Sequence, residues 1–227
     1  RDPEMSRGLG DVYKRQMRKN EQCVKRFLAG VLCAAFVLAG MTACGNTKGA
    51  EGSVIAVSKD GTVTDTIREP FDQDYYSQQE LQDEVLKAVA SYNSGMGNEA
   101  ITVSKVQVDD GVTDVEMKYR SAEDYAAFNR ETFFIGTPAQ ARLSGFDLNK
   151  VYTAVSDPSK TMGMAELFNT DGVLVLITDT TQTVVMSHRI LYISDGVEVA
   201  DHAKAFRVQS DENNQISKEI CVIFKEK

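Results

Sequence analysis

The 227-residue sequence has no tryptophan, only two histidines and four cysteines, and no apolar run of about 18 residues or more. The last absence excludes a protein that crosses a membrane several times with helices. Acidic side chains outnumber basic ones by 33 to 25, which argues against a nucleic-acid-binding protein, since contact with phosphates needs a basic surface. The remaining composition, 42% hydrophobic and 26% charged, is globular rather than collagen-like, disulfide-rich or wholly disordered.

The N-terminal 43 residues are not expected to belong to the fold. Residues 1–16 show no apolar periodicity and resemble the adapter-derived leaders found before reading frames assembled from environmental DNA. The alternative is a genuine polar N-terminal extension. Residues 17–43 are typical of a secretory signal peptide, because four basic residues precede a 15-residue apolar stretch at 27–41. That stretch is shorter than the roughly 20 residues of a stable membrane span, and the alternative is a buried helix of the domain.

The apolar stretch ends in Met41, Thr42, Ala43 and Cys44, which resemble the lipobox of bacterial lipoproteins. The usual form has leucine three residues before the cysteine, where this chain has Met41, an apolar residue of similar volume. The resemblance implies a diacylglyceryl thioether on the Cys44 sulfur and cleavage before Cys44. The alternative is an ordinary signal peptide cut nearby, which leaves a free secreted protein.

Residues 44–53 then form the lipidated cysteine and a Gly-rich, flexible tether with a reach of roughly 16 Å. Two or three acyl chains on one cysteine anchor a protein stably, so no basic patch is required. Residues 1–43 hold 8 of the basic and 4 of the acidic side chains, so the chain from Cys44 onward has a formal charge of -12. Such a domain should stand off anionic headgroups.

As a whole, the chain resembles the small uncharacterised lipoproteins of anaerobic Gram-positive bacteria. The resemblance implies a location, the outer face of the bacterial cytoplasmic membrane, and no activity. After lipidation of Cys44 and loss of the signal peptide, Cys221 is the one remaining cysteine, which excludes an intramolecular disulfide. It lies in the apolar run 220–224, which indicates a buried, inert thiol rather than a nucleophile.

Turn signals predict the strands of the exported domain. Asp60-Gly61 and Asp110-Gly111 predict hairpins, because these residues tolerate the positive φ angles of tight hairpin turns. Asp195-Gly196 repeats the motif between Ile193 and residues 197–199, and a polar hairpin is expected between 206–208 and 220–224. The run 173–177 is apolar on both faces and predicts a central strand.

Start signals predict three helices, at a Ser77–Glu80 capping box, at Ser121 and at Thr137-Pro138. The first should bury one apolar stripe, made of Leu81, Val85, Leu86, Val89 and Tyr92. The predicted order is β-β-α-β-β-α-β-α, followed mostly by strands. This order favours an α+β fold with a mainly antiparallel sheet. Residues 54–227 are expected to form one compact domain. The alternative is a division into two parts near 150–159, where Asp157-Pro158 is a turn signal.

The sequence carries no strong catalytic motif. It lacks a phosphate loop, a nucleophile elbow, a His-Glu-x-x-His helix and a Cys-x-x-Cys pair. His188, His202 and Cys221 match no zinc-ligand spacing, and residues 211–222 lack the glycine and glutamate of a calcium loop. We therefore predict no catalytic residue, no metal site and no cofactor.

The function that we expect is that of a membrane-anchored, non-enzymatic surface module, which binds a protein, a peptide or a wall polymer but not nucleic acid. The alternative is a small cell-envelope hydrolase that uses Asp and Glu carboxylates. A deep cleft with converging carboxyl groups of raised pKa would favour the hydrolase. No sequence pattern selects such a pair, since Asp109-Asp110 suits a turn and Asp114 and Glu116 point away from the apolar face of their strand.

Aromatic residues are concentrated in the first half of the domain. Their expected role is core packing, with a sugar- or peptide-binding face as the alternative, and the absence of tryptophan removes the strongest sugar-stacking residue. The residues concerned are Tyr75, Tyr76, Tyr92, Tyr119, Tyr125, Phe128, Phe133 and Phe134.

Overall fold

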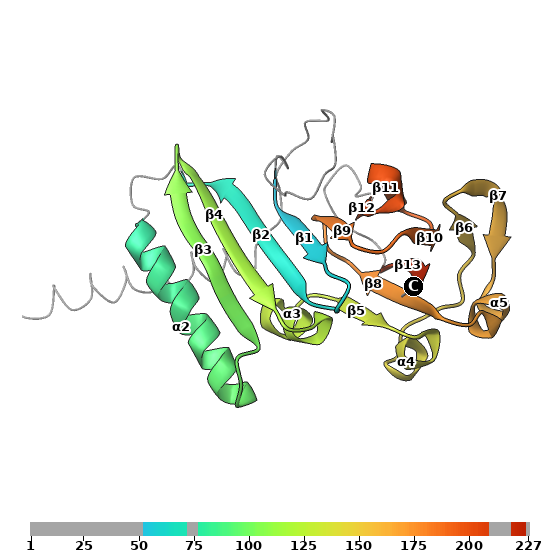
Figure 1. Cartoon of the computed structure of the whole chain (residues 1–227), viewed down its shortest axis with the longest axis horizontal. Coiled ribbons are helices and arrows are strands. Elements are labelled where there is room, and N and C mark those ends of the chain that lie inside the picture. The colour runs from blue at the N-terminus through green and yellow to red at the C-terminus, as the bar shows by residue number, and fades with distance from the viewer. Residues whose placement is uncertain (1–51, 72–76, 209–218, 226–227) are drawn as a thin grey trace, which may run out of the picture. The chain divides into compact units, whose positions relative to one another are not determined.

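The computed structural model describes residues 52–71, 77–208 and 219–225. These residues form an α+β fold with four α-helices and 13 strands in two sheets, as predicted (Figure 1). The first eight elements follow the expected order β-β-α-β-β-α-β-α. The helices are α2 (Gln78–Met96), α3 (Ala122–Asn129), α4 (Pro138–Leu143) and α5 (Met164–Asn169).

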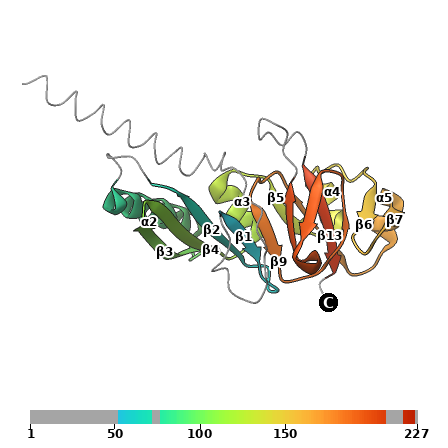
Figure 2. The ribbon, with the colours of Figure 1, turned by 90° about the horizontal axis from the view of Figure 1, so that it is seen from above.

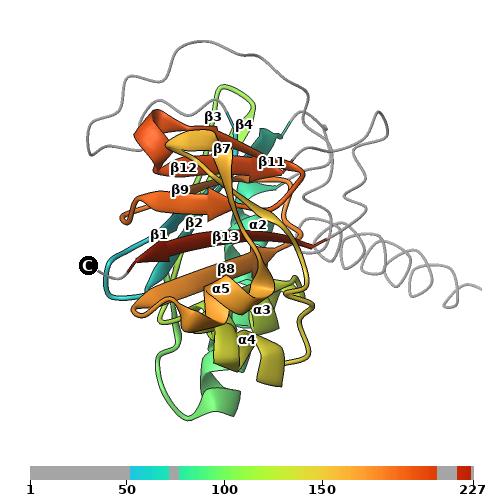
Figure 3. The same ribbon diagram turned by 90° about the vertical axis from the view of Figure 1, so that its right-hand side faces the viewer.

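One sheet has seven strands in the order β11-β12-β9-β1-β2-β4-β3. Its neighbours pair antiparallel except β1 and β9, which run parallel with Val54 opposite Thr183, and Figure 3 shows β9 between β12 and β1. The sheet therefore joins strands from both sides of residues 150–159. Its strands are β1 (Val54–Val57), β2 (Val63–Pro70), β3 (Ile101–Asp109), β4 (Val112–Tyr119), β9 (Thr183–Met186), β11 (Val197–Ala200) and β12 (Ala205–Val208).

The other sheet has six antiparallel strands in the order β5-β8-β13-β10-β6-β7. Strand β8 lies between β5 and β13 and buries five of its six residues, which confirms the predicted central strand. Its strands are β5 (Phe133–Gly136), β6 (Tyr152–Ala154), β7 (Asp157–Met162), β8 (Val173–Thr178), β10 (Ile190–Ile193) and β13 (Ile220–Lys225).

The helices begin at the predicted residues. The Ser77 side chain accepts a hydrogen bond from the Glu80 backbone N–H, and Thr137 and Gln140 form a full capping box before α4. Helix α2 runs along β3 and ends at Gly97, whose φ of 67° is left-handed (Figure 1). Of its predicted stripe, Leu81, Val85 and Val89 are buried, but the inclusion of Leu86 was wrong, because that side chain is 45% exposed.

Two predicted hairpins are confirmed. β1 pairs with β2 across Asp60-Gly61, and β3 pairs with β4 across Asp110-Gly111. Asp110 and Gly111 have φ angles of 47° and 70°, the left-handed values that a tight hairpin turn needs. In β4 every second residue is buried from Thr113 to Tyr119, as the alternating pattern predicts.

Two other predicted hairpins are wrong. Strands β10 and β11, on either side of Asp195-Gly196, lie in different sheets, and so do β12 and β13. The reason is that β13, buried in five of its six residues, pairs with β8 and β10 inside the six-stranded sheet. Ser194 fixes this arrangement, because its N–H donates to the Cys221 carbonyl and its Oγ accepts from the Cys221 N–H.

The region around Asp157-Pro158 also differs from the turn signal. These residues begin β7, the edge strand of the six-stranded sheet, where proline is tolerated because an edge strand has N–H groups without a ladder partner. Helix α5 was not predicted. It has six residues, and its first residue follows Gly163, which provides no side-chain cap. Figure 2 shows α5 near β6 and β7.

Candidate functional site

The predicted lipidation site lies outside the described residues. This applies to Cys44 and to Met41, Thr42 and Ala43, and likewise to Tyr75, Tyr76 and the acidic stretch at 211–215. Among residues 52–71, 77–208 and 219–225, no helix combines the length and the apolar character needed to cross a bilayer.

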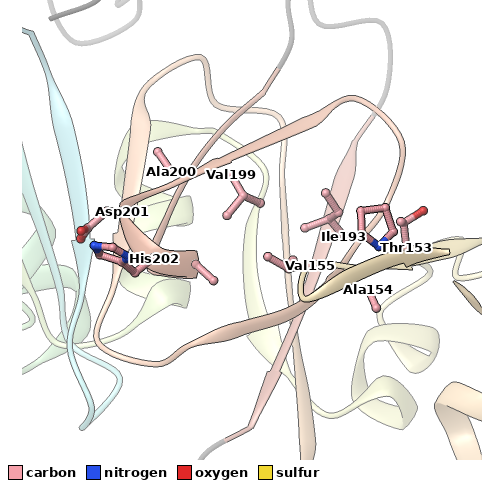
Figure 4. Close-up of a pocket in the computed structure, with 10 residues that line it drawn as sticks. Thr153, Ala154, Val155, Ile193, Val199, Ala200, Asp201 and His202 are labelled. Atoms are coloured by element: carbon pink, nitrogen blue, oxygen red, sulfur yellow. The ribbon is translucent and has the colours of Figure 1, made fainter. Parts of the chain in front are cut away.

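A pocket of about 530 Å³ opens beside β6, β10 and β11. Most of the residues that line the pocket are apolar. Figure 4 shows Asp201 and His202 together at one end of the lining. The volume falls within the range of about 300–1,000 Å³ that is usual for small-molecule sites. The lining residues are Thr153, Ala154, Val155, Pro158, Ile193, Val199, Ala200, Asp201, His202 and Ala203.

The backbone at the polar end of the pocket is strained. Asp201, His202 and Ala203 have φ angles of 49°, 51° and 66°, three successive non-glycine residues in the left-handed region. Each such residue costs roughly 1–2 kcal/mol, and strained backbone tends to cluster at functional sites. The turn is held because the Lys204 N–H donates to the Asp201 carbonyl and the Lys204 carbonyl accepts from the Met186 N–H.

The residues considered for zinc are distributed over different parts of the fold. His188 follows β9 and its ring lies 5.6 Å from that of Phe224, while His202 is exposed in the strained turn. Within the described ranges, no group of three His, Cys, Asp or Glu side chains is placed to hold a metal ion.

Cys221 is buried and forms no disulfide, which confirms the predicted buried thiol. It belongs to the core of the six-stranded sheet together with Tyr152 and Ile223. Burial raises the pKa of the thiol to about 12, against the smaller lowering effects of Lys150 and Tyr152. The thiol is therefore protonated at neutral pH, as expected of an inert side chain.

A second candidate site centres on Asp65 in β2. The strand buries Val63, Asp65 and Ile67 on one face, and Asp65 is only 1% exposed. The pKa of Asp65 is raised to about 8, mainly by burial and also by the nearby Glu131, while the Gln182 side chain acts in the opposite direction. The signal was present in the sequence as an acidic residue at an apolar position of a period-2 strand, but sequence reasoning did not use it.

Polar side chains from other elements surround Asp65. The Tyr125 hydroxyl donates to Glu131 Oε2 at 2.9 Å, and Asn129 Nδ2 donates to the Tyr119 hydroxyl at 3.2 Å. Burial is the main cause that raises the pKa of Glu131, Tyr119 and Tyr125, and the charge of Asp65 adds to the shift of both tyrosines. The group therefore brings two carboxyl groups and two phenols into a largely buried environment.

The carboxyl groups of raised pKa and the pocket do not coincide. Asp201 supplies the one carboxylate of the pocket lining, and neither Asp65 nor Glu131 contributes to it. A carboxylate hydrolase needs two such groups facing a substrate across a cleft. The pocket therefore has a mostly apolar wall and one carboxylate, that of Asp201.

The aromatic residues form a packed group around α3. Tyr119, Tyr125 and Phe133 are buried, in agreement with the predicted core role. The Tyr119 and Tyr125 ring centroids lie 5.1 Å apart, and those of Tyr125 and Phe133 lie 4.9 Å apart, both in edge-to-face geometry. Tyr92 and Phe128 extend the group with centroids 5.6 Å apart.

No protein-family model matches the chain, and no curated protein matches it in sequence. A search of solved structures found the folded domain of the Mycobacterium tuberculosis protein LppM, determined by NMR. The match has a TM-score of 0.32 and 7% sequence identity, and it covers 76% of this chain and 86% of that one. A similarity of this size says nothing about the function of this chain.

Proposed function

We propose that the protein is an extracytoplasmic lipoprotein, anchored to the membrane through Cys44, whose domain binds a small and largely apolar ligand in the pocket beside β11. The anchor places the domain at the outer face of the cytoplasmic membrane. We assign the binding role that we expect from the sequence to this pocket.

The observation that carries the anchor is the order of residues 17–44: a basic head, a short apolar stretch and small residues before a cysteine. The start of the fold is compatible with it. The first strand begins at Val54, so nine residues lie between Cys44 and the sheet. The Gly-rich tether that we predict from the sequence of residues 44–53 accounts for this interval.

The pocket supports a binding role through its lining. Val155, Ile193 and Val199 provide apolar surface, which favours binding of apolar groups by removing them from water (Figure 4). Asp201 and His202 provide polar groups at one end only, which suits a ligand with an apolar body and a polar end.

The anchor is tested by metabolic labelling with a radioactive fatty acid in a bacterial host that processes lipoproteins. The Cys44→Ala variant should lose the label and leave the membrane fraction. Cys33→Ala, a matched change within the predicted signal peptide, should keep both. Label on the Cys44→Ala variant, or an unlabelled wild type, would refute the anchor.

The pocket is tested with N-phenyl-1-naphthylamine, an uncharged apolar dye, and with the chain from Gly45 onward, so that no acyl chain or detergent takes up the dye. Ala200→Trp places a large side chain in the pocket lining and should lower dye affinity at least tenfold. Ala165→Trp, on the exposed surface of α5, is the matched control and should bind like the wild type. Equal binding by both variants would exclude the pocket.

A further inference from the structure

Two buried side-chain oxygen atoms have no hydrogen-bond partner. They are Asp65 Oδ1 and Gln182 Oε1, and within the described residues Thr113 Oγ1 is the one other buried side-chain oxygen of this kind. Asp65 is 1% exposed and Gln182 is 6% exposed, so bulk water does not replace the missing partners. A buried acceptor without a donor is unfavourable, and native proteins contain few of them.

The chemistry of the two side chains indicates that a hydrogen-bond donor between their oxygen atoms is missing. An ionised carboxylate and an amide oxygen are both acceptors, so neither satisfies the other. A protonated carboxyl group, in contrast, has one O–H donor and one acceptor, which match the oxygen and the NH₂ of a carboxamide. The Gln182 side chain is close enough to act on the pKa of Asp65. Gln182 lies two residues before Val184, which pairs with Ile55, the register partner of Asp65.

The charges around Asp65 favour the neutral form. Glu131, from the loop before β5, is the charged group that acts on it, and it raises the pKa. Tyr119 from β4 and Tyr125 from α3 also face it, and both interact with its charge. On the neighbouring strands its register partners are Ile55 and Met117, which carry no charge. No cation acts on the pKa of Asp65.

The position of the pair gives it a structural role. Asp65 lies in β2 of the seven-stranded sheet, while Gln182 lies in the connection from β8 of the six-stranded sheet to β9 of the seven-stranded sheet. Glu131 directly precedes Thr132 and Phe133 at the start of β5, in the six-stranded sheet. Segments that link the two sheets therefore converge on one carboxyl group.

We propose that Asp65 is a proton-binding site, protonated at neutral pH, and that the bound proton pairs Asp65 with Gln182 and so fastens the β8–β9 connection to strand β2. Loss of the proton leaves a buried carboxylate beside Glu131 and removes the only donor for Gln182 Oε1. The contact between the two segments thereby becomes sensitive to alkaline pH.

The direct test follows aspartate carboxyl carbons by NMR in the full chain labelled with ¹³C at that atom, so that glutamates are silent. One aspartate should titrate near pH 8, far above the ordinary value of about 3.9, and it should be absent from Asp65→Asn. The proposal is overturned if every aspartate of the wild type titrates below pH 6. This measurement does not depend on the variant being folded.

The pairing is tested with Gln182→Leu. By linkage, a contact that the bound proton strengthens raises the proton affinity of Asp65, so loss of Gln182 should move the Asp65 midpoint downward. An unchanged midpoint, or an upward shift, which would mean that Gln182 only donates to the ionised carboxylate, would overturn the pairing.

A second test measures unfolding of the full chain between pH 4 and pH 9. The unfolded chain releases the Asp65 proton near pH 4 and the folded chain near pH 8, so stability is lost as pH rises between these values. The folding equilibrium constant of Asp65→Asn relative to wild type should therefore rise up to tenfold per pH unit and level off above pH 8. Glu116→Gln, the same loss of an acid on the other face of β4, is the control. A ratio for Asp65→Asn that does not change with pH would overturn the proposal.

Discussion

Asp65 and Asp124 are both buried aspartates, 1% and 2% exposed, but their surroundings are opposite. Asp124 accepts hydrogen bonds from Arg120 at 3.1 and 3.3 Å, from Ser121 Oγ at 3.1 Å and from the Tyr92 hydroxyl at 3.2 Å. Asp65 has an oxygen without any partner and an acidic neighbour. Two equally buried carboxyl groups can therefore differ completely in the groups that face them.

The partners of Asp124 are local, and those of Asp65 are not. Arg120 and Ser121 precede Asp124 by four and three residues, at the start of α3. Gln182 and Glu131 are distant from Asp65 in sequence and reach it through two loops. A carboxylate at the start of a helix is stabilised by its own segment, whereas Asp65 depends on the assembly of the sheets.

Substituting asparagine for Asp65 and for Asp124 should change the free energy of unfolding in opposite directions, and the change at Asp65 should be the larger. Asp65→Asn should raise the free energy of unfolding by about 4 kcal/mol at pH 7, because a pKa near 8 instead of about 3.9 opposes folding over roughly three pH units. Urea denaturation at pH 7 measures the change. A loss of stability would show that the Asp65 carboxylate has a favourable partner in the fold.

Asp124→Asn should act in the opposite direction. The change removes the charge that pairs with Arg120 and leaves one former acceptor position as an NH₂ donor, so we expect a loss of about 1–3 kcal/mol. The same urea titration compares it with Asp65→Asn. If both variants shift stability in one direction, the contrast between the two aspartates is wrong.

Tyr92→Phe sharpens the comparison by removing one donor of Asp124 and nothing near Asp65. Tyr92 is half-buried, so the lost hydrogen bond should cost about 1 kcal/mol. In a double-mutant cycle its effect should be coupled to Asp124→Asn and additive with Asp65→Asn. Additivity with Asp124→Asn would mean that the hydrogen bond makes no contribution in solution.

The smallest effect on the free energy of unfolding is expected at Glu116, an acidic residue that is not buried. Glu116 alternates with the buried residues of β4 and is half-exposed, so Glu116→Gln should change the free energy of unfolding by less than about 0.5 kcal/mol at pH 7. Thermal or urea denaturation checks this value. A larger change would show that the general acidity of the domain, rather than the setting of Asp65, determines its response.

Much of the local structure was predictable from short segments. Ser77, Ser121 and Thr137 each begin a helix because a side-chain oxygen there accepts from a backbone N–H. The turns at Asp60-Gly61 and Asp110-Gly111 require φ angles that few residues adopt. Helix α5 escaped prediction because Gly163 gives no such side-chain signal.

The candidate sites were less predictable. The pocket is lined by β6 and β10 of the six-stranded sheet and by β11 of the seven-stranded sheet, whereas the turn signal at Asp195-Gly196 suggested a hairpin with β10 and β11 in one sheet. In the sequence, Asp65 is recognisable only as an acidic residue on the apolar face of a strand. The residues around it do not indicate that Gln182 and Glu131 are its neighbours in the fold. The anchor at Cys44 stays a prediction from residues 17–44.

The sequence by itself determined the class of fold, the order of the first eight elements and the burial of Cys221, because turns, caps and apolar periodicity act over a few residues. The tertiary structure decided which strands become neighbours, such as β1 beside β9, and hence what surrounds Asp65 and lines the pocket. The physical reason is that strand pairing and desolvation arise between segments far apart in the chain, whose energies depend on the whole assembly.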